Sequence, residues 1–174
     1  MHRTRRRPVV IAAATIAVIG AFAATAAAFV TSSSGKAQVS MSNVAETAPV
    51  STMSTTWVDL NSTIPLSAPS DGLLVNARFT AESLCTQKAG ICRVRIVADD
   101  GNTLTELEPV SGLDFAFDTS TGNASIDDLA EGHAMERSRR LPKGDYRIRV
   151  QYSVSAGSTK FTLDDWHFSV EASE

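Results

Sequence analysis

Residues 146–154 read Tyr-Arg-Ile-Arg-Val-Gln-Tyr-Ser-Val, with an apolar side chain at every second position. Because successive side chains of a strand point to opposite faces, this alternation predicts a β-strand with one face in a core and the other toward solvent. Residues 141–145, Leu-Pro-Lys-Gly-Asp, come directly before it and contain the Pro and Gly typical of a tight reversal. We therefore predict a turn followed by a half-buried strand.

The same period of two recurs nearer the N-terminus. Two further inward-facing rows are predicted, one over residues 73–81 and one over residues 94–98. Residues 99–102, Asp-Asp-Gly-Asn, follow the second row and predict a hairpin turn, because Gly adopts positive φ without strain. Residues 103–107 are then expected to form the returning strand.

Near the C-terminus, alternating apolar residues move from odd-numbered to even-numbered positions. The odd positions are Phe161 and Leu163, and the even positions are Trp166, Phe168 and Val170. One extra residue at the Asp164-Asp165 step would return all five side chains to one face, which is the effect of a β-bulge. We predict a bulge at this step.

These segments together indicate the fold class. Residues 57–174 contain seven to nine of them, with turn signals every 8 to 12 residues. Residues 126–135 come nearest to a helical period, but Gly132 interrupts them, so one short turn is expected there. We predict an all-β fold, an antiparallel β-sandwich or jelly roll of about seven to nine strands.

The first thirty residues differ from the rest of the chain. Four arginines within residues 3–7 precede residues 9–30, which carry no charge and include the small residues 26–28, Ala-Ala-Ala. This order predicts a secretory signal peptide over residues 1–28. A membrane anchor to about residue 30 is the alternative, because 22 helical residues span about 33 Å. Both readings place the remaining chain outside the cell, secreted or at the extracytoplasmic surface.

Residues 29–56 are rich in Ser, Thr and Ala and poor in aromatic residues. Such a composition buries too little apolar surface to offset the entropy of ordering. We therefore predict a flexible linker over residues 29–56, leading to the domain at residues 57–174.

The charge of the exported part constrains its partners. Without the four N-terminal arginines, 12 Lys and Arg remain against 19 Asp and Glu, a net charge of −7. This charge disfavours nucleic acid and anionic lipid as main partners. Membrane contact is expected only through an uncleaved N-terminal segment.

The chain has two cysteines, Cys85 and Cys92. An even pair in an exported domain predicts a disulfide, here between two successive strands. A metal site would need further ligands nearby, and the six intervening residues offer none. A redox-active pair normally has two intervening residues, which disfavours that alternative.

Two groups of polar residues are candidates for ligand or metal binding. Asp127, Asp128 and Glu131 lie in a loop and could offer oxygen ligands to calcium, although their spacing matches no EF-hand loop. Asp165 and His167 flank Trp166 and could contact a ligand, but the alternative is a solvated bulge. We expect no metal or organic cofactor to be required for folding or action.

No catalytic residue can be assigned from the sequence. After the first thirty residues only two histidines remain, and both cysteines are expected to be paired. There is no Gly-x-Ser-x-Gly turn and no glycine-rich phosphate loop. Enzymatic activity is therefore disfavoured.

Three segments carry a resemblance: residues 73–85, residues 92–96 and residues 161–167. They resemble a group of secreted actinobacterial proteins of unknown function, with a Cys pair before a central strand and a Trp in the last strand. The resemblance covers residues 57–174. It implies an extracellular β-sandwich and no particular activity.

The resulting hypothesis is an exported, non-enzymatic β-sandwich that binds a partner, a glycan or another protein. One alternative is a secreted hydrolase acting on cell-wall or environmental polymers, which a Ser, His and Asp cluster in one cleft would favour. The other is a structural subunit or inhibitor that acts through an exposed edge strand.

Overall fold

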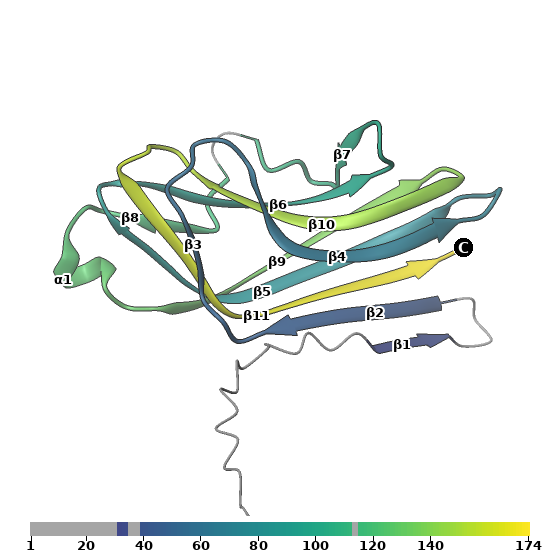
Figure 1. Ribbon diagram of the computed structural model, residues 1–174, viewed down its shortest axis with the longest axis horizontal. Coiled ribbons are helices and arrows are strands. Elements are labelled where there is room, and N and C mark those ends of the chain that lie inside the picture. The colour runs from purple at the N-terminus through teal and green to yellow at the C-terminus, as the bar shows by residue number, and fades with distance from the viewer. Residues whose placement is uncertain (1–30, 35–38, 113–114) are drawn as a thin grey trace, which may run out of the picture.

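The computed structural model describes residues 31–34, 39–112 and 115–174. The signal peptide or anchor predicted over residues 1–28 lies outside these ranges. Within them the chain forms eleven strands and one helical turn, and the strands make two packed antiparallel sheets (Figure 1). The predicted β-sandwich is therefore confirmed, and eight of the strands fall within residues 57–174.

The strands of the first sheet are β1 (Thr31–Ser34), β2 (Val39–Glu46), β3 (Val50–Thr52), β5 (Leu73–Gln87), β9 (Glu131–Leu141) and β11 (Thr159–Ser173). Their order is β1-β2-β11-β5-β9, and β3 also pairs with β11. The strands of the second sheet are β4 (Val58–Ala68), β6 (Gly90–Asp99), β7 (Leu104–Glu106), β8 (Asp118–Ser120) and β10 (Gly144–Val154). Their order is β4-β10-β6-β7, with β8 also paired to β6.

The helical turn α1 (Ala124–Asp127) lies at one end of the sandwich, near β8 (Figure 1). The expected short turn is present, but it begins at Ala124, and β9 already starts at Glu131. In the described part of the chain, no helix has the length and apolar character needed to cross a membrane.

The core lies between the two sheets and follows the predicted inward rows. Every apolar residue of the rows in β5, β6, β10 and β11 is buried. Aromatic rings contact one another in the core: the ring centroid of Phe79 is 5.7 Å from that of Phe117 and 6.3 Å from that of Trp166. Phe161 lies 6.3 Å from Phe117 and 6.0 Å from Tyr152 in the same way.

The predicted bulge in β11 is confirmed. The pairing of β11 with β5 shifts register between Asp164 and His167, and Asp165 has a φ of 41°. Trp166 is consequently buried in the core, as are the apolar residues before and after the bulge. One extra residue therefore keeps the whole row on a single face.

The predicted linker is wrong over residues 31–34, 39–46 and 50–52, because these segments are strands of the first sheet. β2 pairs with β11 from Trp166 to Ser173, and β3 pairs with β11 from Phe161 to Leu163. Strands pair through their backbone N–H and C=O groups. A Ser- and Thr-rich segment can therefore join a sheet when the other strands supply most of its buried apolar residues. Val44 of β2 is buried in the core.

On the outer face of the second sheet, polar side chains from neighbouring strands bind one another. Arg149 contacts Asp59 at 2.7 Å and Asp99 at 2.8 Å, joining three strands. Gln151 donates to Asp59 and accepts from Arg95, each at 2.8 Å. These side chains therefore hydrogen-bond one another across β4, β10 and β6.

Candidate ligand-binding cleft

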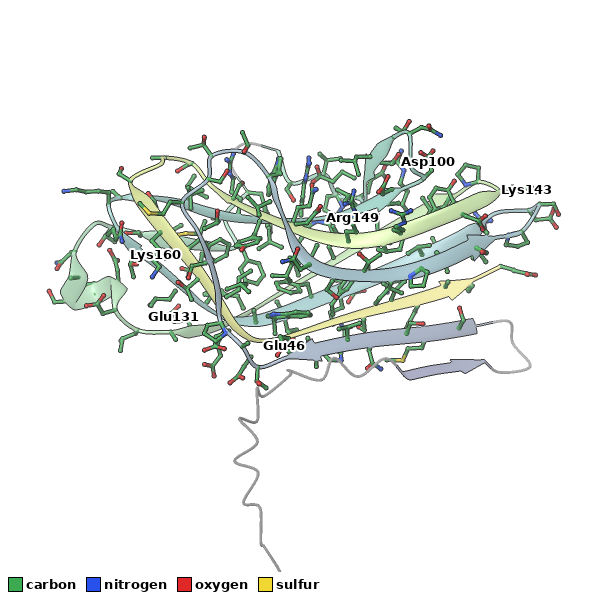
Figure 2. All side chains as sticks on the ribbon, viewed as in Figure 1. Glu46, Asp100, Glu131, Lys143, Arg149 and Lys160 are labelled. Carbon is green, nitrogen blue, oxygen red and sulfur yellow. A yellow bond between two sulfur atoms is a disulfide. The ribbon has the colours of Figure 1, made fainter. Side chains whose placement is uncertain are left out.

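An open cleft of about 430 Å³ lies at the end of the sandwich that carries α1. β8 contributes Asp118 to its lining, α1 contributes Ile126 and Asp127, and β9 contributes Glu131 and His133. Figure 2 shows Glu131 near α1 at this end of the molecule. None of the described residues that line the cleft is Lys or Arg. Cys85 of β5 also lines it, so the cleft is acidic and combines side chains from four separate elements.

Asp127 closes the loop between β8 and α1. Its Oδ1 accepts hydrogen bonds from the backbone N and the Oγ1 of Thr121, both at 3.0 Å. Its Oδ2 accepts from Ser120 Oγ at 2.9 Å and from the backbone N–H groups of Gly122 and Asn123 at 2.8 and 3.0 Å. Burial acts to raise the pKa of Asp127, but these hydrogen bonds to the charged form outweigh it and hold the pKa below its usual value.

The three calcium candidates are not brought together as ligands. Asp127 directs both oxygens at donors of its own loop, whereas Asp128 and Glu131 are exposed. The lone pairs of Asp127 that a calcium ion would need are already occupied by N–H and O–H groups. Among the described residues, no three His, Cys, Asp or Glu side chains form a group that could hold a metal ion.

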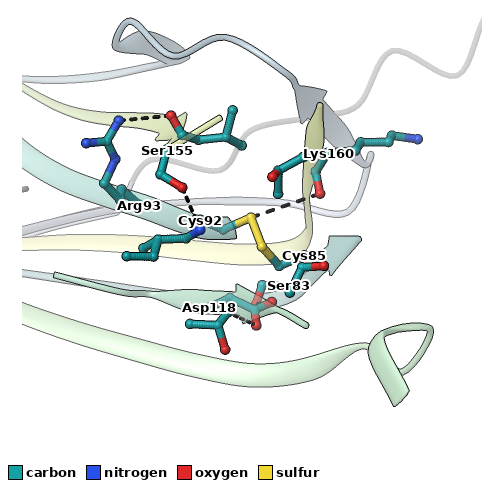
Figure 3. Close-up of a disulfide and its surroundings, with 12 residues drawn as sticks. Ser83, Cys85, Cys92, Arg93, Asp118, Ser155 and Lys160 are labelled. Atoms are coloured by element: carbon teal, nitrogen blue, oxygen red, sulfur yellow. Dashed lines mark hydrogen bonds between the residues drawn. A yellow bond between two sulfur atoms is a disulfide. The ribbon is translucent and has the colours of Figure 1, made fainter. Parts of the chain in front are cut away.

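Ser83 connects two of the ionisable residues of the cleft. Its Oγ donates to Asp118 Oδ2 at 2.7 Å and lies 2.9 Å from His133 Nδ1. The other ring nitrogen, His133 Nε2, lies 3.8 Å from Glu131 Oε2. Figure 3 shows Ser83 and Asp118 together beside the disulfide.

This arrangement resembles the Ser, His and Asp cluster of a hydrolase, but its hydrogen bonds run differently. A serine nucleophile must give its proton to a base and must reach the substrate. The Ser83 hydroxyl donates to Asp118 instead, and the residue is only 1% exposed. Ser83 therefore orients the imidazole of His133 and is not poised for attack.

Apolar side chains form the other part of the cleft. Ile126 is 61% exposed and Leu129 is 72% exposed, and both line the cleft. Phe117 is buried beneath, with its ring centroid 5.6 Å from that of His133. Large exposed apolar side chains beside free polar groups are typical of a binding site.

Sequence reasoning missed this cluster because its members are far apart in the chain. Ser83 is 35 residues from Asp118 and 50 residues from His133. One signal was present: the inward row of residues 73–81 continues with the same period to Ser83 and Cys85. A polar residue at an inward position must find a buried partner, and Asp118 and His133 are the partners of Ser83.

The predicted disulfide between Cys85 and Cys92 is confirmed, with an S–S distance of 2.09 Å (Figure 3). Cys85 belongs to β5 in the first sheet and Cys92 to β6 in the second, so the bond joins the two sheets. Cys85 also lines the cleft. The disulfide therefore holds the sheets together next to the candidate site.

Asp165 and His167, the second pair of candidates, do not reach this cleft. Asp165 is exposed in the bulge of β11, and His167 faces away from the core. His167 lines a separate groove of about 310 Å³ on the outer face of the first sheet, together with Arg78 and Thr80. The structure thus places these two residues at the outer surface of the sandwich.

The chain matches no protein-family model and no curated protein. Among solved structures, TmCBM61 in complex with β-1,4-galactotriose has 14% identity and a TM-score of 0.31 over 81% of this chain and 86% of that chain.

Two further solved structures are similar to the same degree. A carbohydrate-binding module from Cellvibrio mixtus lichenase 5A, in complex with cellotriose, has 13% identity and a TM-score of 0.31 over 84% of this chain and 86% of its own. The CBM22-1 xylan-binding domain from Paenibacillus barcinonensis Xyn10C has 9% identity and a TM-score of 0.29 over 81% of this chain and 80% of its own. These scores are too low to transfer a ligand or a site to this chain.

Proposed function

We propose that this protein is an exported, non-enzymatic binding module and that the cleft beside α1 holds a glycan. The observation that supports the proposal is the composition of the cleft lining. Hydrogen-bond acceptors on Glu131 and His133 lie in the same cleft as the exposed aliphatic side chains of Ile126 and Leu129. A sugar ring offers the matching surface, with hydroxyl donors at its edge and C–H groups on its faces.

The hydrogen bonds of Ser83 support binding over hydrolysis. Its proton is engaged by Asp118, and the side chain is buried behind the cleft. A hydrolase at this site would need a serine that is both accessible and activated by a base.

The disulfide supports the proposed location. Disulfides form and persist in oxidising compartments, and the Cys85–Cys92 bond agrees with the export that the N-terminal residues predict. We place the protein outside the cytoplasm, secreted or held at the cell surface.

Calorimetric titration of the purified chain with soluble oligosaccharides from cell-wall and environmental polysaccharides tests the proposal. We expect Ile126→Ser and Leu129→Ser each to weaken binding by about tenfold, because each removes exposed apolar contact area. Val110→Ser is the matched control, since Val110 is 59% exposed but does not line the cleft.

Two results would contradict the proposal. Equal affinities for the Ile126, Leu129 and Val110 variants would mean that ligands bind elsewhere. Shortened oligosaccharide products, found by mass spectrometry after incubation with the chain and lost in Ser83→Ala, would favour the hydrolase instead.

A further inference from the structure

The hydrogen bonds around Ser83 determine which nitrogen of His133 carries the proton. An ionised carboxylate only accepts hydrogen bonds, so Asp118 Oδ2 takes the single hydroxyl proton of Ser83 at 2.7 Å. Ser83 Oγ can then only accept from His133 Nδ1, which lies 2.9 Å away. The neutral imidazole is therefore held with its proton on Nδ1, which leaves Nε2 as an acceptor.

Nε2 and Glu131 then form two neighbouring acceptors, and no residue that the structure describes donates a hydrogen bond to either of them. His133 Nε2 lies 3.8 Å from Glu131 Oε2, and both residues line the cleft. Two acceptors cannot satisfy each other, so each needs a donor from water or from a ligand.

The other carboxylates of the cleft already accept hydrogen bonds from the protein. Asp118 accepts from Ser83 Oγ with one oxygen and from the backbone N of Thr119, at 2.6 Å, with the other. Asp127 accepts from five donors of its own loop. Of the carboxylate and imidazole acceptors in the described lining, those of Glu131 and His133 Nε2 are thus the ones that accept no hydrogen bond from the protein.

We infer that His133 Nε2 and Glu131 Oε2 together accept hydrogen bonds from two adjacent hydroxyl groups of the ligand, so that the cleft selects sugars with a free vicinal diol. This inference rests on the proposed function and names the part of the glycan that the cleft recognises. In it, Glu131 and His133 contact the ligand, and Ser83 is a positioning residue that acts through His133.

The tautomer can be tested in the full chain without any ligand. Two-bond ¹H–¹⁵N correlation spectra at about pH 8, where histidine side chains are ordinarily neutral, distinguish a protonated from an unprotonated ring nitrogen. We expect an unprotonated Nε2 in the parent and in Ser83→Thr, which keeps the hydroxyl. In Ser83→Ala, we expect proton exchange between the two nitrogens. A protonated Nε2 in the neutral ring of the parent would overturn the inference.

The diol can be tested with the tightest-binding oligosaccharide from the titration above and with its mono-O-methylated derivatives. Methylating either hydroxyl of one vicinal pair should weaken binding about tenfold or more, because it removes a donor and leaves an acceptor unpaired. Glu131→Gln should reduce this discrimination. Asp128→Asn, which makes the same charge change outside the cleft lining, should leave it intact.

The outcomes separate the two proposals. If Nε2 is unprotonated but no oligosaccharide binds, the proposed function fails and the diol assignment fails with it. If an oligosaccharide binds in the cleft with affinity that methylation and Glu131→Gln leave unchanged, the proposed function stands and this inference is overturned. A ligand that needs an ammonium group in place of the diol would overturn it as well.

Discussion

A single carboxylate organises the loop beside the cleft. Asp127 was a calcium candidate in the sequence, yet it is 9% exposed and accepts five hydrogen bonds from residues 120–123. These hydrogen bonds use the carboxylate oxygens that a calcium ion would need as ligands. The loop in turn sets the position of Ile126 on α1.

Asp127→Asn should lower the melting temperature at pH 7 by roughly 5 °C, because the neutral amide accepts hydrogen bonds from these donors less well. The pKa of Asp127 lies below its usual value, so its contribution to stability is present above the usual aspartate pKa and is lost as the pH falls through the lowered pKa. Thermal melts between pH 7 and pH 2 should therefore show a smaller loss of stability in the variant.

The exposed Asp128→Asn is the control for this prediction and should melt within about 1 °C of the parent. The same melts with millimolar calcium or with chelator should coincide. A calcium-dependent rise of more than a few degrees would contradict the assignment of Asp127 to the loop and would support a metal site.

At the scale of elements, the bulge in β11 has the greatest consequence for the core. Asp165 adopts a φ of 41°, and the register with β5 shifts around it. The apolar residues before and after the bulge therefore face the same core. β11 pairs with β5 along one edge and with β2 along the other. Removing one residue from a strand reverses the face of every side chain beyond it.

Deletion of Asp165 should therefore turn Trp166 toward solvent and lower the unfolding free energy by more than about 4 kcal/mol. Urea denaturation and the emission maximum of Trp166 measure the two effects, ideally in a Trp57→Phe background. Asp165→Gly keeps the residue count and suits the positive φ, so it should change stability by less than about 1 kcal/mol. Similar unfolding midpoints for the deletion and the Gly variant would disprove the bulge.

At the scale of the whole molecule, the sandwich begins before the boundary predicted at residue 57. β2 and β3 pair with one edge of β11, whose other edge pairs with β5. Without them β11 would become an edge strand with unpaired N–H and C=O groups. The residues expected to be a linker thus protect the central strand of the first sheet.

A chain that starts at Trp57 should unfold at a temperature at least 10 °C lower than one that starts at Thr31, or should aggregate through the exposed edge of β11. Calorimetry and size-exclusion chromatography distinguish these results. Equal melting temperatures and monomeric elution for both chains would show that residues before Trp57 are dispensable.

The sequence alone determined the features that depend on the alternation of apolar and polar residues along one strand, or on residues close together in the chain. The inward rows of β5, β6 and β10, the bulge at Asp165 and the pairing of Cys85 with Cys92 were all predictable. Each follows from residues close together in the chain, because side-chain alternation is a property of a single strand.

Features that depend on neighbours in space were decided only by the tertiary structure. β2 has few apolar residues and forms because β11 offers backbone hydrogen-bond partners. In β9 the apolar alternation cannot be read from the sequence, because Arg137 occupies an inward position, where its guanidinium packs on the ring of Phe115. The cleft depends most on tertiary structure. Ser83 and His133 come from paired strands, and Asp118 reaches them from the other sheet, so only the packing of the two sheets gives each buried polar group its partner.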